Sequence, residues 1–313
     1  MPNWNDVLKE IVAEREESLT RVRGAVDIVR RRYLDRLFKK TGRNVIAYYS
    51  GFLSKPGIAL EDINDEDKNG FMMAVHRLER DKGLDLILHT PGGNIAATQS
   101  IVDYLHQMFG NNIRAIVPQI AMSAGTMLAC SCRSIVMSKH SNLGPIDPHL
   151  NGVPAYGVIK EFERACSEAK NDPGKAAMWH AIVSQYRPTF LSQCQNAIDW
   201  SNDFVREQLE TVMFQGRADA KAKAEDVVTK LTDYSGNKTH SRHIHYDECR
   251  DIGLVVERLE DDADLQDLVL TVHHAYMHSL MNTPSFKMIE NHLGTAFVKQ
   301  HVVQQVIQQV QQT

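Results

Sequence analysis

Four short apolar runs, separated by segments with helical spacing, occupy residues 44–137 and constrain the fold more than any other feature of the sequence. Apolar runs without polar alternation are typical of strands that are buried on both faces. Strands that alternate with helices along the chain favour a parallel sheet covered by helices, so the sequence predicts an α/β fold. The expected strands are residues 44–50, 84–89, 113–117 and 134–137, and the expected helices are residues 65–80, 95–109 and 124–131.

Mostly helical sequence flanks this alternating region. The first forty residues have apolar positions at helical spacing among charges of both signs, which indicates a packing or oligomerisation helix rather than a membrane-surface helix. The Gln-rich end at residues 302–313 has similar spacing but is too short to indicate a coiled coil. We expect a helical segment over residues 1–43, a core domain over residues 44–260 and a helical extension over residues 261–313. The helices expected after residue 154 are 158–170, 176–186, 189–214, 221–231 and 265–281.

Composition and charge argue against several classes of protein. The sequence is 43% hydrophobic and 24% charged, which is an ordinary globular composition. Because the net charge is −4, nothing indicates binding to nucleic acid or to an anionic membrane. No stretch approaches the roughly 18 apolar residues of a membrane span, and the charged N-terminal sequence does not resemble a signal peptide. Five cysteines, an odd number, suit free thiols in a reducing compartment. We therefore expect a cytoplasmic protein.

The first chemically informative segment is the turn after the expected strand 84–89. It reads Thr90-Pro91-Gly92-Gly93-Asn94 and leads into the expected helix 95–109. Glycines allow positive φ and a close approach of the backbone to a ligand, and N–H groups at the mouth of a helix favour negative charge. Such groups can form an oxyanion hole, which stabilises the tetrahedral intermediate of acyl transfer. A plain strand-to-helix turn would use the same residues.

The second segment places Ser123 where an apolar strand gives way to a helix of small residues. Ala121, Ala124 and Gly125 leave room around its hydroxyl, as attack on a substrate carbonyl requires. The backbone N–H of Ala124 would supply a second oxyanion donor. Serine is also a common N-cap, whose hydroxyl satisfies free backbone donors of the helix. Both interpretations remain open from this segment alone.

The two segments follow successive strands, so a parallel sheet would bring them to one edge, where ligands bind. Three stretches, HTPGGNIAATQSIVDYL, IVPQIAMSAGTMLACSC and SIVMSKHSNLGPIDP, together resemble the core of the Clp-protease/SppA superfamily. Within it, the chain is similar to the serine dehydrogenase proteinase family, which comprises Clp-class serine peptidases related to SppA. The similarity extends to HSRHIHYDECRDIGLVVERL and VHHAYMHSLMNTPSFKMIENHLG near the carboxyl end.

This resemblance implies both a fold and an activity. The fold would be a ClpP/crotonase-like spiral of ββα units with added N-terminal and C-terminal helices. Ser123 matches the nucleophile of a serine endopeptidase, and Gly92 or Gly93 together with Ala124 matches the oxyanion donors. The resemblance implies a peptide or unfolded protein as substrate, a homo-oligomer and no cofactor. Two alternatives remain: a catalytically silent scaffold that binds peptides, and a crotonase-type enzyme that holds an acyl-CoA thioester with the same N–H groups.

A serine hydroxyl needs a base to remove its proton, and here the sequence departs from the Clp pattern. Aligning Asp147-Pro148 with the Gln-Pro of Clp proteases places Ile146 at the position of their histidine. His149 is one possible substitute. SppA-like peptidases use a lysine, which acts as a base when an apolar pocket lowers its pKa. We rank Lys175, at about the SppA spacing, first, Lys160 second and His149 third.

Histidines near the carboxyl end could suggest metal binding. The pattern H-x-x-H-x-H-x-x-x-C that starts at His240 fits no common zinc site. A second group has two histidines four residues apart on a helix but lacks the glutamate of an HExxH motif. We therefore expect no metal site. The residues set aside are His240, His243, His245, Cys249, His273, His274 and His278.

Overall fold

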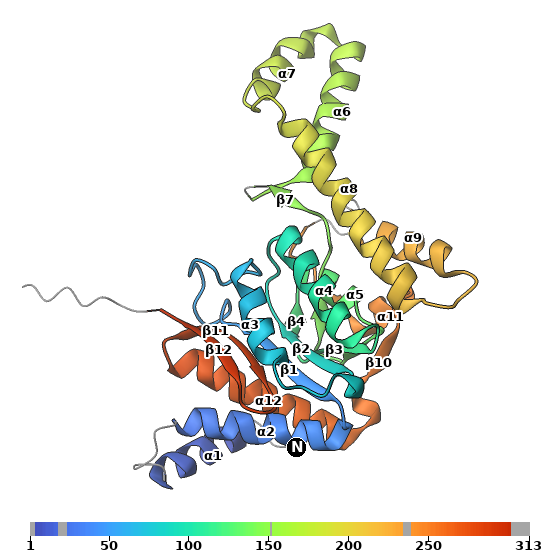
Figure 1. Cartoon of the computed structure of the whole chain (residues 1–313). Helices are drawn as coiled ribbons and strands as arrows, with labels where there is room; N and C mark the ends of the chain where they lie inside the picture. Colours follow the sequence, from blue (N-terminus) through green and yellow to red (C-terminus); the bar gives the residue numbers. More distant parts are fainter. Residues whose placement is uncertain (1–3, 18–23, 151, 234–238, 302–313) are drawn as a thin grey trace, which may run out of the picture.

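A seven-stranded sheet forms the centre of the molecule. The computed structural model describes residues 4–17, 24–150, 152–233 and 239–301. Five neighbouring strands of the sheet are parallel, and the last two continue it antiparallel (Figure 1). In sheet order the strands are β10 (Val256–Arg258), β5 (Ser134–Met137), β3 (Ile113–Val117), β2 (Leu84–His89), β1 (Asn44–Ser50), β11 (Ser285–Asn291) and β12 (Ala296–Gln300).

Helices cover both faces of this sheet, which explains why its strands are apolar throughout. In β1, Ile46 and Tyr48 pack into one hydrophobic cluster, whereas Val45, Ala47 and Tyr49 pack into the other. Successive side chains of a strand point to opposite faces, so a sheet covered on both sides needs apolar residues at every position. The first face is covered by α3 (Glu66–Val75), α4 (Ile95–Phe109) and α5 (Ala124–Cys130), and the second by α1 (Trp4–Glu17), α2 (Ala25–Thr41) and α12 (Ala263–Asn282).

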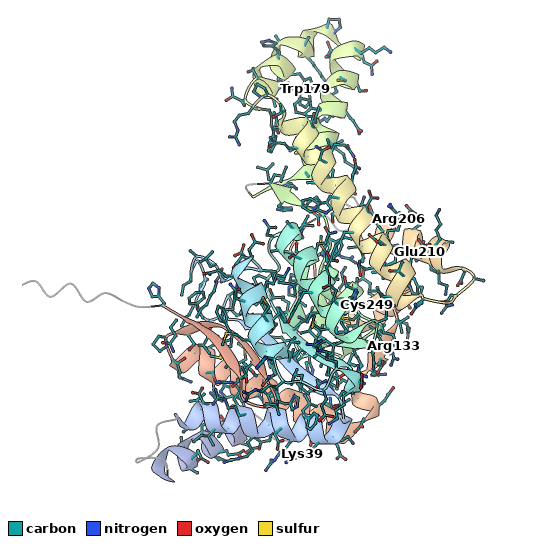
Figure 2. All side chains as sticks on the ribbon, viewed as in Figure 1. Lys39, Arg133, Trp179, Arg206, Glu210 and Cys249 are labelled. Atoms are coloured by element: carbon teal, nitrogen blue, oxygen red, sulfur yellow. The ribbon has the colours of Figure 1, made fainter. Side chains whose placement is uncertain are left out.

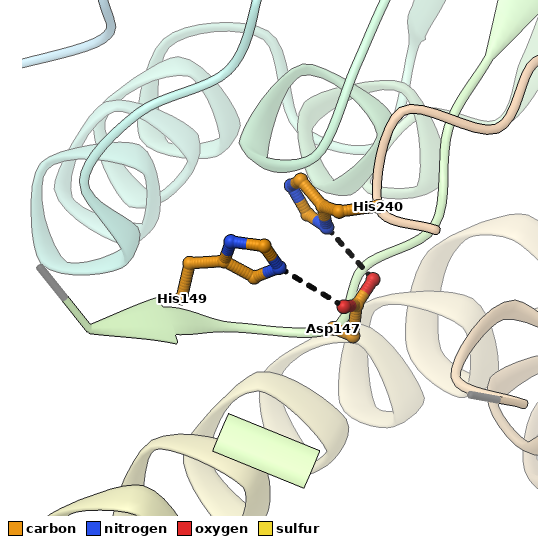
Figure 3. A group of neighbouring side chains, drawn as sticks. All are labelled: Asp147, His149 and His240. Atoms are coloured by element: carbon orange, nitrogen blue, oxygen red, sulfur yellow. Dashed lines mark hydrogen bonds and ion pairs between the residues drawn. The ribbon is translucent and has the colours of Figure 1, made fainter. Parts of the chain in front are cut away.

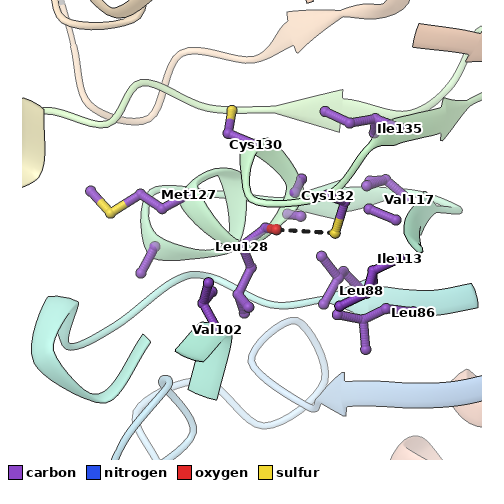
Figure 4. Packing of buried hydrophobic residues seen from close by; sticks show 14 of the residues in the cluster. Leu86, Leu88, Val102, Ile113, Val117, Met127, Leu128, Cys130, Cys132 and Ile135 are labelled. Carbon is purple, nitrogen blue, oxygen red and sulfur yellow. Dashed lines mark hydrogen bonds between the residues drawn. The ribbon is translucent and has the colours of Figure 1, made fainter. Parts of the chain in front are cut away.

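Two cysteines illustrate the packing of the first face. Cys130 ends α5 and Cys132 follows it, and both thiols are buried among strand and helix side chains (Figure 4). The Cys132 thiol donates to the Leu128 carbonyl at 3.4 Å. Burial raises the pKa of Cys132 to about 12. Both residues therefore act as small apolar side chains rather than as reactive thiols.

Two smaller β-structures lie beyond the carboxyl ends of the central strands. Strands β4 (Ile120–Ala121), β6 (Asn142–Leu143) and β9 (Ile244–His245) form a short sheet in that order. Strands β7 (His149–Leu150) and β8 (Val153–Pro154) pair as a hairpin. The short sheet meets the loop that leaves β2 through a β-bridge between Thr90 and Ala121.

An arm of helices projects from the core (Figure 1). It consists of α6 (Ala155–Asn171), α7 (Ala176–Val183) and the start of α8 (Phe190–Gln208), and it has a hydrophobic cluster of its own. Trp179 lies in this arm (Figure 2), where its indole N–H donates to Glu168 at 3.1 Å. The far end of α8 continues as a π-helical turn, packs into the main core and contacts α9 (Ala220–Leu231). The short helix α11 (Tyr246–Ile252) lies between β9 and β10 in the chain.

The expected alternation of strands and helices over residues 44–137 is confirmed. The segment after residue 261 differs from expectation, because α12 is followed by β11 and β12, which join the central sheet. The Gln-rich end lies outside the described residues. Among the helices of the described ranges, none is both long and apolar enough to cross a membrane.

A buried ion pair links α3 to β11. The carboxylate of Asp67 accepts hydrogen bonds from Lys287 Nζ at 2.9 and 3.0 Å and from the Tyr48 hydroxyl at 2.7 Å. Both charged side chains are completely buried. Burial lowers the pKa of Lys287, although the Asp67 carboxylate favours its charged form. Lys287 Nζ also donates to the carbonyl of Asp62, so the pair supports the loop before α3.

We expect Asp67→Ala to lower the free energy of unfolding by about 3–5 kcal/mol, because it leaves a buried ammonium without its counter-charge. Denaturant unfolding would measure this loss. The exposed Asp65→Ala serves as the control and should change stability little. The double variant Asp67→Ala/Lys287→Met should recover much of the loss, and equal losses in the single and double variants would show that charge is not the cause.

Candidate active site

The glycine turn and the serine turn lie side by side. Thr90, which follows β2, donates its N–H to the Ile120 carbonyl at 3.2 Å and accepts the N–H of Met122 at 3.1 Å. A Cβ added at Gly92 would lie only 2.8 Å from Cβ of Ser123 and 3.0 Å from the backbone nitrogen of Ala124. The glycine turn and the serine turn therefore lie in contact, as the sequence predicts.

The loop before α3 holds the glycine turn from the other side. Ile63 donates to the Gly92 carbonyl at 2.7 Å and accepts the N–H of Asn94 at 2.9 Å. Gly92 has φ +102° and Gly93 has φ +153°, and a Cβ at Gly93 would lie 2.3 Å from the backbone nitrogen of Ile63. Only glycine fits such a conformation and such a contact.

The backbone N–H of Gly92 has a hydrogen-bond partner within the turn, whereas that of Gly93 has none in the described ranges. The Gly92 N–H donates to the Thr90 hydroxyl at 3.2 Å. Gly93 lies between the two residues that bond Ile63, so its own N–H faces away from that loop. Within the described ranges, the N–H groups of Gly93 and Ala124 have no hydrogen-bond partner. Gly93 lines the pocket beside Ser123, whereas Ala124 is completely buried.

Ser123 has an unusual backbone conformation at the entrance of α5. Its φ is +51° and its ψ −116°, and its side chain makes no capping hydrogen bond to the helix. The interpretation of Ser123 as an ordinary N-cap is therefore wrong. A non-glycine residue in such a region costs about 1–3 kcal/mol and is typical of functional sites. The turn is stabilised by Thr126, whose hydroxyl donates to the Ala121 carbonyl at 2.9 Å and accepts the N–H of Gly144 at 2.9 Å.

A pocket of about 240 Å³ opens over Ser123. Of the residues that line it, His149 alone carries a side chain that can act as a base. Apolar walls come from α5, from the β7 hairpin and from α8, including the exposed Trp200. The residues that line the pocket are Gly93, Asn94, Ile95, Ala96, Ser123, Met127, Pro148, His149, Leu150, Ala197 and Trp200.

His149 belongs to a cluster with Asp147 and His240 (Figure 3). One carboxylate oxygen of Asp147 lies 3.4 Å from His149 Nε2, and the other lies 2.7 Å from His240 Nδ1. The two imidazole rings lie against each other, with centroids 4.1 Å apart. Burial by itself would raise the pKa of Asp147, but hydrogen bonds from His149 and His240 outweigh burial and lower the pKa. The cluster thus joins an ionised, buried carboxylate to two imidazoles.

The two lysines ranked above His149 lie on the arm. Lys175 follows the turn between α6 and α7, is half-exposed and lies 3.4 Å from a Glu168 oxygen. Lys160 is an exposed residue of α6. Neither lines the pocket of Ser123. Ile146, aligned with the Clp histidine, is fully buried in the main core.

Sequence reasoning missed two members of the cluster. Asp147 served only as an alignment marker, although its spacing of two from His149 in an extended segment would have placed both side chains on one face. His240 was considered only with His243, His245 and Cys249. No local signal connects it with Asp147, which lies 93 residues earlier. Within the described ranges, Asp147, His149 and His240 form the one group with metal-ligand geometry.

Comparison with known proteins agrees with the geometry. Two uncharacterized proteins of Methanocaldococcus jannaschii are similar to the chain: MJ0137 is 29% identical over 214 residues and MJ1495 is 28% identical over 194 residues. These matches cover 68% and 62% of the chain, and they span 65% and 59% of the relatives, less than two thirds of their length. A family model described as ClpP-like SDH-type serine proteinase matches residues 20–294. The chain therefore belongs to the family of ClpP-like SDH-type serine proteinases.

Proposed function

We propose that the chain is a serine endopeptidase that cleaves peptide bonds through an acyl-enzyme on Ser123. The observation that carries this proposal is the strained Ser123 at a helix entrance, in one pocket with the free N–H of Gly93 and the imidazole of His149. A nucleophile, oxyanion donors and a base are the three groups that acyl transfer requires.

The base in this proposal is His149, oriented by Asp147. Its position in the Ser123 pocket favours it over Lys175 and Lys160, which lie on the arm. A base must reach the proton that it removes, and neither lysine lines the pocket of Ser123. The Asp147 carboxylate beside His149 Nε2 fixes the ring and stabilises the imidazolium that forms during the reaction. His240 occupies the other oxygen of the same carboxylate.

The proposed steps follow from these positions. The Ser123 hydroxyl attacks the carbonyl carbon of the scissile bond while His149 takes its proton. The negative charge on the carbonyl oxygen is received by the N–H groups of Gly93 and Ala124, because the Gly92 N–H already donates to Thr90. The C–N bond then breaks, and His149 returns the proton to the leaving amine. Water then attacks the ester carbonyl while His149 takes its proton, the C–O bond to Ser123 breaks, and His149 returns the proton to the Ser123 oxygen.

The pocket suits an extended peptide or a segment of unfolded protein. Its apolar walls, Met127, Leu150 and Trp200, would accept an apolar side chain of the substrate. The small sheet beyond the carboxyl ends of the central strands supports the proposed spiral of ββα units. We also propose a homo-oligomer, as the resemblance to Clp-type peptidases implies.

The test is covalent labelling by a fluorophosphonate probe, which reacts with activated serines. We expect one label per chain, mapped by mass spectrometry to the peptide that contains Ser123. Heat-unfolded protein is the control and should not be labelled, because activation depends on the assembled site. A folded protein that refuses the probe, or that is labelled on another serine, would contradict the proposal. Binding of a CoA thioester in calorimetry would instead support a crotonase-type enzyme.

A further inference from the structure

We propose that Asp147, His149 and His240 form a binding site for a divalent transition-metal ion such as Zn²⁺, and that the bound ion inhibits the peptidase. The inhibition, though not the binding, rests on the proposed function. The three ligand atoms lie within 4.8 Å of one another and come from two segments of the chain, one with Asp147 and His149 and the other with His240 (Figure 3).

The donor set fits zinc. Two imidazole nitrogens and one carboxylate oxygen are ligands that Zn²⁺ prefers, and sites with three protein ligands keep the fourth position for water or substrate. Ligand atoms around a tetrahedral zinc are about 3.4 Å apart, given bond lengths of about 2.0–2.1 Å. The separation from Asp147 to His149 Nε2 is 3.4 Å, and the separation to His240 Nδ1 is 2.7 Å. Small side-chain rotations would therefore admit the ion between the three groups.

The electrostatics of the cluster also favour a cation. The Asp147 side chain is only 6% exposed, and its two oxygens lie 3.4 Å from His149 Nε2 and 2.7 Å from His240 Nδ1. Within the described ranges, Asp147 forms ion pairs with the two histidines alone. Both rings retain partial access to solvent, with side-chain exposures of 29% and 24%, so an ion can reach them.

Metal binding and catalysis compete for the same imidazole. His149 presents Nε2 to the cluster, so an ion on Nε2 leaves the single ring proton on Nδ1, and a protonated Nδ1 cannot take the proton of Ser123. Asp147 would turn from the ring to the metal. The ion would therefore withdraw the base from Ser123 without touching the nucleophile. Removal of the metal would restore activity.

The binding experiment uses the full chain without a polyhistidine tag, treated with a chelator and desalted. Zn²⁺ is titrated by competition with a chromogenic chelator, and Co²⁺ is added separately to record absorption spectra. We expect one ion per chain and tetrahedral Co²⁺ bands without a thiolate charge-transfer band, because no cysteine belongs to the cluster. His240→Gln should weaken Zn²⁺ binding more than about tenfold. The matched control is His243→Gln, which changes an exposed imidazole three residues away and should bind as the wild type does.

The inhibition experiment compares the rate of fluorophosphonate labelling of Ser123 with and without Zn²⁺. We expect at least a tenfold slower reaction at saturating metal and full recovery on chelation. Equal Zn²⁺ affinity of the wild type and His240→Gln, or a thiolate band with Co²⁺, would overturn the site. Binding without slower labelling would overturn the inhibition. Failure of labelling in metal-free protein would count against the peptidase proposal alone, because Zn²⁺ affinity is measured without activity.

Discussion

Replacement of Ser123 by alanine is expected to lower kcat/KM for peptide hydrolysis by at least about 10⁴-fold, the scale seen when a catalytic serine is removed from a triad. The hydroxyl is the atom that attacks, and nothing else in the pocket can replace it. A small residual rate should remain, since the oxyanion donors and the substrate-binding walls are unchanged. A fluorogenic peptide assay would measure the loss.

The same substitution should leave the fold intact. The Ser123 hydroxyl caps no backbone group, so its removal breaks no hydrogen bond of the helix α5. Circular dichroism and thermal unfolding should therefore match the wild type. Ser184→Ala on the exposed surface of the arm is the control for activity. Retention of full activity by Ser123→Ala would assign the nucleophile to another residue.

Replacement of His149 by glutamine is expected to reduce kcat by about 10²–10⁴-fold, the usual contribution of a general base. Glutamine can still hydrogen-bond to Asp147 but cannot take the serine proton at neutral pH. KM should change little, because the apolar walls that bind the substrate are retained. Steady-state kinetics on the same peptide would separate kcat from KM.

Three variants distinguish this assignment from its rivals. Lys175→Ala and Lys160→Ala, both on the exposed arm, should keep wild-type kcat. If Lys175→Ala lowers kcat strongly and His149→Gln lowers it only slightly, the lysine is the general base. A large loss in His240→Gln with a mild effect of His149→Gln would transfer it to the second imidazole on Asp147.

Much of the sheet could be predicted from the sequence, because β1, β2, β3 and β5 are apolar runs bounded by turn residues. Strand β11 could not. It reads SFKMIEN, and a lysine, a glutamate and an asparagine do not indicate a buried strand. Each of these polar groups is satisfied by a partner more than 200 residues away in sequence: Lys287 by Asp67, Glu290 by Arg30, and Asn291 by the Ala74 carbonyl. Such pairings leave no local pattern.

In the candidate site, too, the parts with a local sequence pattern could be predicted and the parts that depend on distant contacts could not. The serine and glycine turns could be predicted because each has a local signature and both end adjacent parallel strands. The base could not be assigned, because its environment depends on contacts between distant segments. Asp147 meets His240 of the segment 239–243 although 93 residues separate them in the sequence. The exposure of the two lysines follows from their position on the projecting arm.

Hydrogen bonds on both sides of the glycine turn have a consequence for ligand binding. On one side, Ile63 hydrogen-bonds to the backbone of Gly92 and Asn94. On the other side, Thr90 hydrogen-bonds to the backbone on either side of Ala121, just before Ser123. An arriving carbonyl therefore meets N–H dipoles that these hydrogen bonds already hold in place. Rigid mimics of the tetrahedral state, such as peptide boronates, should dock into the resting molecule without induced fit.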